Sequence, residues 1–359
     1  MQHTSFDETP ARRYSRRRLL TLGARASLGL GLASTLGACT VPGVTGTATP
    51  LPPTPTPVPI PVNLLSGHSS PAVWVGWRPK KTLLASLGAG DGLRIWDIDS
   101  GDTLTNIAAT SFFTPAPGET VTLNTAAWSP DGNTIALGFG STRRGGIRLW
   151  DVESKSIVTQ IDTPDTVLHL DWSPDGKQIV STSYARLSLW QVPGGASIKN
   201  FQVEGHGGYP AWSPDGKTLA IVTYSRNVAL VDAASGQPTT TYRGVGNGAN
   251  IVVWSNKGSS LVAVANVIFV YQPQAQNQAP VTLDVGFAAN ALVWSPDDTY
   301  LAAARYPVNI AQLSSQSVVA TLGDRHDPEL LAVDWSSDGN RLATGGTDGK
   351  IHLYAVNNF

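Results

Sequence analysis

Side chains that could carry chemistry are few in this sequence, and their spacing gives no sign of a catalytic centre. Six histidines are present, and no pair of them has ligand spacing with the single cysteine or with a carboxylate. We therefore expect no bound metal and no cofactor. There is no Gly-x-Ser-x-Gly segment to present a nucleophilic serine. His169 could line a central opening, or it could be an ordinary strand histidine. No residue is predicted to be catalytic, and the chain is not expected to be an enzyme.

A recurring set of aspartates looks at first like an acidic site. Each follows Ser-Pro or Ser-Ser in a short repeated phrase, where aspartate bonds to its own backbone and shapes a tight turn. Turn formation explains them better than chemistry does. The set comprises Asp131, Asp175, Asp215, Asp297 and Asp338.

Cys39 is the one residue with a specific predicted modification. The segment Leu36-Gly-Ala-Cys39 resembles the cleavage site of bacterial lipoproteins, in which the thiol becomes the attachment point for diacylglycerol. The alternative is an incidental cysteine inside a membrane span. Because Cys39 ends an apolar run behind arginines and a Pro/Thr tract follows it, we expect lipidation and membrane anchoring.

Residues 1–38 are predicted to be an export signal. Ser15-Arg16-Arg17-Arg18-Leu19-Leu20 resembles the twin-arginine signal, with Arg16 and Arg17 as its pair, and a weakly apolar run follows. Arg25 interrupts that run, so the general secretory route stays open. Either route would place the mature protein on the outer face of the bacterial cytoplasmic membrane.

The remainder of the chain divides into a linker and a folded part. Residues 39–62 contain the cysteine and a Pro/Thr-rich tract, which favours extended polyproline II and would act as a spacer. Six of the 25 basic residues precede residue 39, so the chain from there on is net acidic. It lacks the basic footprint of a nucleic-acid-binding protein.

One phrase built on tryptophan recurs through residues 63–359, and it decides the fold class. Its tryptophans are 51, 44, 40, 42, 40 and 41 residues apart, and each is followed by two further apolar runs. Alternating apolar residues and Pro-Asp-Gly turns indicate short strands, and a single blade of strands cannot bury both faces. The tryptophans are Trp77, Trp128, Trp172, Trp212, Trp254, Trp294 and Trp335.

The period, with Gly67-His68 standing 28 residues before Trp96-Asp97, resembles the WD-repeat propellers. That resemblance implies an all-β, seven-bladed β-propeller of four-stranded antiparallel blades. It also implies that His68 joins a network with a Ser or Thr and the aromatic residue of its blade. The last repeat ends after its third strand, so we expect residues near 62–65 to close the last blade.

The segments that depart from the repeat suggest where a partner could bind. The topology that this resemblance implies would place an insertion at 108–119 and the loop 140–146 on the same face, bringing Phe112 and Phe113 close to Arg143 and Arg144. Aromatic and arginine clusters are typical interface anchors. Alternatively, the two phenylalanines fold back over the edge of the ring. Trp74 and Tyr209, near the rim of that face, are further candidates.

These features predict a membrane-tethered, extracytoplasmic interaction scaffold that binds a protein or peptide. The alternative is a propeller that binds or hydrolyses a small molecule or glycan at its central funnel. An enzyme would need converging carboxylate, histidine or metal ligands. The sequence shows an irregular apolar and arginine-bearing face instead.

Overall fold

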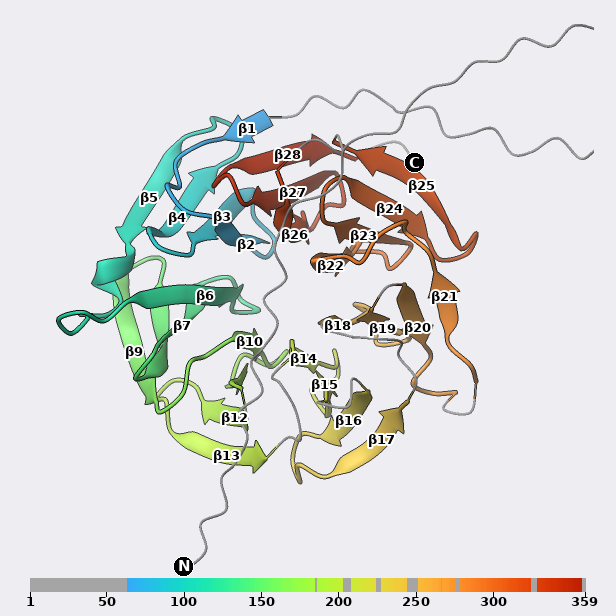
Figure 1. Ribbon diagram of the computed structural model, residues 1–359, viewed down its shortest axis with the longest axis horizontal. Coiled ribbons are helices and arrows are strands. Elements are labelled where there is room, and N and C mark those ends of the chain that lie inside the picture. The colour runs from blue at the N-terminus through green and yellow to red at the C-terminus, as the bar shows by residue number, and fades with distance from the viewer. Residues whose placement is uncertain are drawn as a thin grey trace, which may run out of the picture. The chain divides into compact units, whose positions relative to one another are not determined.

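The computed structural model describes residues 63–356, apart from 185, 203–207, 224–226, 244–250, 266, 276–277 and 324–327. These residues all belong to the unit Thr54–Phe359. They form seven four-stranded antiparallel sheets, set as blades around a central axis with the first strand of each blade innermost (Figure 1). The predicted all-β, seven-bladed propeller is confirmed. Within the described residues the helical structure is one short 3-10 turn, η1 (Ala109–Ser111).

The strands follow the chain blade by blade. Blades 1 and 2 contain β2 (Ala72–Trp77), β3 (Leu83–Gly88), β4 (Gly92–Asp97), β5 (Thr103–Ala108), β6 (Val121–Trp128), β7 (Thr134–Ser141), β8 (Gly145–Asp151) and β9 (Ser156–Thr163). Blades 3 and 4 contain β10 (His169–Trp172), β11 (Gln178–Thr182), β12 (Arg186–Gln191), β13 (Ser197–Gln202), β14 (Ala211–Trp212), β15 (Thr218–Val222), β16 (Val228–Asp232) and β17 (Pro238–Tyr242). Blades 5 and 6 contain β18 (Ile251–Trp254), β19 (Leu261–Val264), β20 (Ile268–Tyr271), β21 (Val281–Leu283), β22 (Ala291–Trp294), β23 (Tyr300–Ala304), β24 (Val308–Gln312) and β25 (Ser317–Leu322). Blade 7 contains β26 (Leu330–Trp335), β27 (Arg341–Gly346), β28 (Ile351–Ala355) and β1 (Asn63–Leu65).

The repeated phrase forms the turn between the first and second strands of a blade. In blade 2 the Ser129 hydroxyl donates to Asp131, which also accepts the N–H of Asn133 at 3.0 Å. The N–H of Thr134 donates to Ser129 Oγ at 3.0 Å, and Gly132 takes a φ of +72°, which glycine adopts without strain. The same serine-to-aspartate bond occurs at Asp175, Asp215, Asp297 and Asp338. The prediction that these aspartates are turn residues is confirmed.

The core is a ring of interfaces between neighbouring blades. The described residues form seven clusters of buried apolar side chains, and each cluster takes its members from two adjacent blades. Phrase tryptophans add polar links between blades: Trp128 Nε1 donates to the Gly76 carbonyl at 2.9 Å, and Trp172 Nε1 to the Ala127 carbonyl at 3.1 Å. Each blade is therefore stabilised mainly by its two neighbours.

The ring is closed by the two ends of the described chain. β1 pairs antiparallel with β28, with Asn63 opposite Leu353 and Leu65 opposite Ile351, so blade 7 takes its outer strand from the start of the domain. This confirms the predicted closure. Leu65 is buried in the cluster shared by blades 7 and 1. The Asp334 carboxylate accepts the N–H of Trp77 across the same junction at 2.7 Å.

The outer edges of the blades are interrupted by β-bulges. In blades 1, 2, 3, 4 and 6 the pairing of the third and fourth strands shifts by one residue. The residue left out of register is exposed and aliphatic in the first three of these: Leu104, Val158 and Ile198. A bulge twists an edge strand and makes it a poor template for pairing with another chain.

Shortening Leu65 should test how much the closing strand contributes to stability. We expect Leu65→Ala to lower the free energy of unfolding by about 2–3 kcal/mol, because a buried leucine loses contacts and leaves a cavity. Leu65 is 7% exposed, whereas its neighbour Leu64 is 47% exposed and serves as the matched control. Leu64→Ala should change stability by less than about 0.5 kcal/mol. Equal effects in urea unfolding would show that β1 does not hold the ring closed.

Candidate functional site

The four antiparallel strands of a blade divide its loops between two faces. The Trp-Ser-Pro-Asp-Gly turns lie on one face. The connections between blades, and the loops between second and third strands, lie on the opposite face, which we call the loop face. The insertion after β5 and the loop between β7 and β8 both lie on the loop face, as predicted. Loops held on a rigid scaffold are where binding residues concentrate.

Phe112 is not an exposed anchor: of the two predicted arrangements, the structure has the one in which the phenylalanine folds back over the edge of the propeller. Its side chain is 2% exposed and belongs to the apolar cluster between blades 1 and 2. The ring meets Trp150 edge-on, with centroids 6.2 Å apart. Phe113 is partly buried and stacks on Phe139 at 5.3 Å. Both phenylalanine side chains fold back onto the edge of the propeller, because burying apolar surface there is more favourable than leaving it in water.

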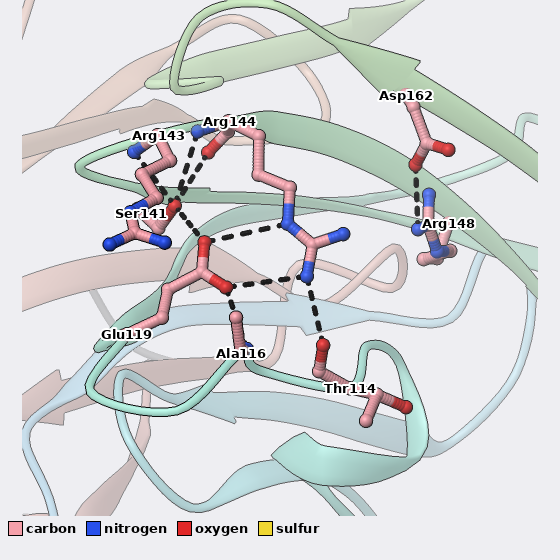
Figure 2. Close-up of polar contacts among 8 residues, drawn as sticks. All are labelled: Thr114, Ala116, Glu119, Ser141, Arg143, Arg144, Arg148 and Asp162. Carbon is pink, nitrogen blue, oxygen red and sulfur yellow. Dashed lines mark hydrogen bonds and ion pairs between the residues drawn. The ribbon is translucent and has the colours of Figure 1, made fainter.

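Glu119 fastens the insertion to blade 2 (Figure 2). Its carboxylate accepts the Ser141 hydroxyl at 2.6 Å, the Ala116 N–H at 2.9 Å and the Arg144 guanidinium at 3.3 Å. Arg144 also donates to the carbonyl of Thr114 at 2.8 Å. These donors, Ser141 foremost, lower the pKa of Glu119 to about 2. The insertion and the blade 2 loop do meet, but they meet through Arg144 and Glu119 rather than through the phenylalanine rings.

A second arginine fixes the base of the insertion. Arg148, on β8, is buried; its Nε donates to the Phe112 carbonyl at 2.9 Å and its Nη2 to Asp162 at 2.8 Å. Its guanidinium also lies 4.8 Å from the centre of the Phe139 ring. The insertion is therefore held at both ends by arginines of blade 2.

Arg143 is the candidate that remains available to a partner. It is exposed, and its guanidinium has no hydrogen-bond or ion-pair partner among the residues the structure describes. The Ser141 hydroxyl oxygen accepts the N–H groups of Arg143 and Arg144 at 3.1 and 3.2 Å, while its proton goes to Glu119. The backbone that carries Arg143 is therefore held in place while its side chain is free to bind.

Beside Arg143 lies a cavity of about 530 Å³, which we call the blade 2–3 hollow. It is lined by the loop Gly140–Arg144, by residues 164–166, by threonine hydroxyls and Asn124 of blade 2, and by Leu168 and Tyr184 of blade 3. Tyr184 is 64% exposed. It was missed in the sequence, where an aromatic residue between two short strands gives no sign of its exposure.

Trp74 and Tyr209 line the central channel, a cavity of about 370 Å³ enclosed by the first strands of the blades. Tyr209 stacks on His169 with ring centroids 3.6 Å apart. Burial lowers the pKa of His169 to about 4, so its ring is neutral at pH 7. The ring nitrogen Nδ1 has no partner within the described part of the chain. Both predicted residues therefore lie at the channel.

Two aspartates of the channel wall were also missed. The first strand of every blade is paired on one side only, so the N–H groups along its free edge lack a strand partner. Asp334 accepts the N–H of Trp77 at 2.7 Å, and Asp171 accepts that of Trp212 at 3.0 Å, in each case on the next blade. Burial raises the pKa of both carboxyls to about 7. Both directly precede the phrase tryptophan, where the other repeats have Gly, Ala or Val, and that difference was a readable signal.

His68 forms the network expected of it. Its Nε2 lies 2.7 Å from Ser86 Oγ, which also accepts Trp96 Nε1 at 2.8 Å, while its Nδ1 lies 3.1 Å from Asp91. This chain of bonds links β3, β4 and the loop between them to the segment that enters blade 1. In blade 3 the corresponding Trp190 Nε1 donates to Ser181 at 2.8 Å.

Other predicted residues lie beyond what the structure covers. Cys39, Arg16 and Arg17 fall outside the described residues. Among the described residues, no helix has the length and apolar character needed to cross a membrane. The same residues include no group of three His, Cys, Asp or Glu side chains placed to hold a metal ion.

Two protein-family models match parts of the chain. Residues 117–207 match the model for eukaryotic translation initiation factor eIF2A, and residues 292–359 match the anaphase-promoting complex subunit 4 WD40 domain. With the seven-bladed fold and the His68 network, these matches support the WD-repeat family for this chain.

Curated relatives point the same way. The anaphase-promoting complex subunit cdc20 of Dictyostelium discoideum is 31% identical over 152 residues, which is 40% of this chain and 28% of that protein. The WD repeat-containing protein slp1 of Schizosaccharomyces pombe is 29% identical over 149 residues, again 40% and 28%. The WD repeat-containing protein WDS homolog of Arabidopsis thaliana is 30% identical over 118 residues, 33% and 21%. The chain thus spans less than a third of the length of each.

The raised pKa of Asp334 predicts a pH-dependent stability difference. A carboxyl with a pKa of about 7 when folded and 3.8 when unfolded destabilises the fold progressively as pH rises from 4 to 7. Asp334→Asn removes this dependence. We expect the variant to gain on the order of 1 kcal/mol relative to the wild type between pH 5 and pH 8, measured by urea unfolding. If the new amide lowers the free energy of unfolding, it does so equally at every pH. The test is therefore how the stability difference between variant and wild type changes with pH.

Asp338→Asn is the matched control, four positions along. The Ser336 hydroxyl lowers the pKa of Asp338, so this carboxylate stabilises the fold at neutral pH and loses that effect in acid. The control variant should therefore gain relative to the wild type as pH falls. If Asp334→Asn follows the wild type at every pH, the Asp334 carboxyl titrates normally and the prediction is wrong.

Proposed function

We propose that this chain is a protein-interaction scaffold that binds a protein or peptide partner on the loop face of blades 2 and 3. The observation that carries the proposal is Arg143, a cation on a fixed loop with no partner in the described chain, beside the exposed Tyr184. Exposed arginine and tyrosine on a rigid support are typical of binding hot spots. The proposal concerns binding alone and invokes no catalytic step and no cofactor.

The comparisons support an interaction role in general terms. One relative is named as a subunit of the anaphase-promoting complex, and one family model describes a WD40 domain of another subunit of a complex with that name. Those names describe the relatives.

Photocrosslinking from the loop face would test the scaffold role. Tyr184→p-benzoylphenylalanine places a crosslinker on the loop face of blade 3, and Lys177→p-benzoylphenylalanine places one on the opposite face of the same blade. We expect a discrete crosslinked partner from position 184 and none from position 177, identified by mass spectrometry. Crosslinks from position 177 alone, or from neither position, would refute the loop-face scaffold.

We also propose that the scaffold is tethered outside the cytoplasm through a lipidated Cys39. The support is the sequence itself: the Arg16-Arg17 pair, the apolar run, the Leu-Gly-Ala-Cys39 segment and the Pro/Thr-rich spacer. Several acyl chains on one cysteine would give stable anchoring, since each buried CH₂ contributes about 0.8 kcal/mol.

Removing the cysteine would test the tether. Cys39→Ala should move the protein from the membrane fraction to the soluble fraction of a bacterial host, because the acyl attachment point is gone. Thr40→Ala, the adjacent change, should leave fractionation unaltered. Retention of the Cys39→Ala protein in membranes would contradict the lipoprotein proposal.

A further inference from the structure

Arg143 differs from the neighbouring arginines of blades 2 and 3. Arg144, Arg148 and Arg186 each have a guanidinium nitrogen within 4 Å of an aspartate or glutamate oxygen. Arg143 has no such counter-ion among the described residues. Because a guanidinium presents paired N–H donors that match a carboxylate, the structure leaves one such fork open at the edge of the blade 2–3 hollow.

The loop that carries this arginine is already ordered. Ser141 receives two backbone N–H groups of the loop and donates to Glu119, whose side chain is only 1% exposed. Arg144, in the same loop, donates to this carboxylate and to the carbonyl of Thr114, both in the insertion (Figure 2). A ligand that pairs with Arg143 would order one side chain and no backbone, and such preorganisation favours affinity.

The rest of the hollow provides a site of mixed character. Tyr184 and Leu168 offer apolar surface on the blade 3 side, and threonine hydroxyls line the blade 2 side. The acidic side chain in the lining, Asp165, lies 3.7 Å from Arg186, which balances its charge. The hollow therefore carries a local positive charge next to an apolar platform, on a chain that is otherwise net acidic.

We propose that the blade 2–3 hollow binds an acidic peptide segment of the partner, with a carboxylate on Arg143 and a neighbouring apolar side chain against Tyr184 and Leu168. The proposal rests on the scaffold function and names the chemistry of its partner. The net acidity of residues 39–359 makes a polyanion such as nucleic acid a poor fit, because long-range repulsion opposes it. A single peptide carboxylate, in contrast, needs only one cation at short range, and the Arg143 guanidinium provides it.

Peptide selection on the full-length protein tests this directly. Peptides are selected from a random phage-displayed library, resynthesised with a fluorophore and titrated by fluorescence polarisation. We expect the selected peptides to be enriched in Asp and Glu over the unselected library. Arg143→Gln should weaken their binding by about tenfold, as loss of an interface hot spot does. Arg243→Gln, at an exposed arginine beyond β17 in blade 4, is the matched control and should leave binding within about twofold.

A double-mutant cycle shows whether the two charges meet. Replacing the key Glu of a selected peptide by Gln should weaken binding as much as Arg143→Gln does. The loss of binding free energy with both changes made should be less than the sum of the two single losses, because contacting groups are coupled. Additive losses, no acidic enrichment, or equal binding by the Arg143→Gln protein would overturn the proposal. Crosslinking from position 184 combined with any of these results would keep the scaffold function and discard only the acidic ligand.

Discussion

No blade of this propeller can bury both of its faces by itself, and the whole structure follows from that constraint. The seven apolar clusters each lie between two blades, so the core is distributed around a circle instead of gathered at a centre. Polar links also join neighbouring blades: Trp128 of blade 2 donates to a carbonyl of blade 1, and Asp334 of blade 7 accepts an N–H of blade 1. A ring built in this way reaches its full stability only when the last interface, between blades 7 and 1, has formed.

Much of this architecture could be predicted from sequence because it repeats. Seven tryptophans at nearly constant intervals predict seven units, and the Ser-Pro-Asp-Gly turns follow from the chemistry of their own residues. The closing strand was predictable because the last repeat was one strand short. These features depend on local sequence or on counting, both of which a single sequence contains.

The functional face was less predictable because it depends on contacts between distant residues. The pattern of the insertion left Phe112 and Phe113 equally suited to exposure or burial, and only the neighbouring Trp150 and Phe139 decide for burial. The role of Glu119 depends on Ser141 and Arg144 in another loop. The candidate site is therefore centred on Arg143 and Tyr184, whose side chains stay exposed, instead of on the aromatic pair.

The pairing of β1 with β28 also has a consequence for how the chain folds. Its three register pairs join residues from opposite ends of the described sequence, which makes them the most non-local contacts in the ring. Loop-closure entropy must be overcome before such contacts contribute, and non-local pairing slows folding. Successive blades can form on the ribosome as they emerge, but blade 7 cannot be completed until nearly the whole domain has been synthesised. Closure is thus expected to be the last and slowest step, and until then blade 7 presents an unpaired edge that chaperones could recognise.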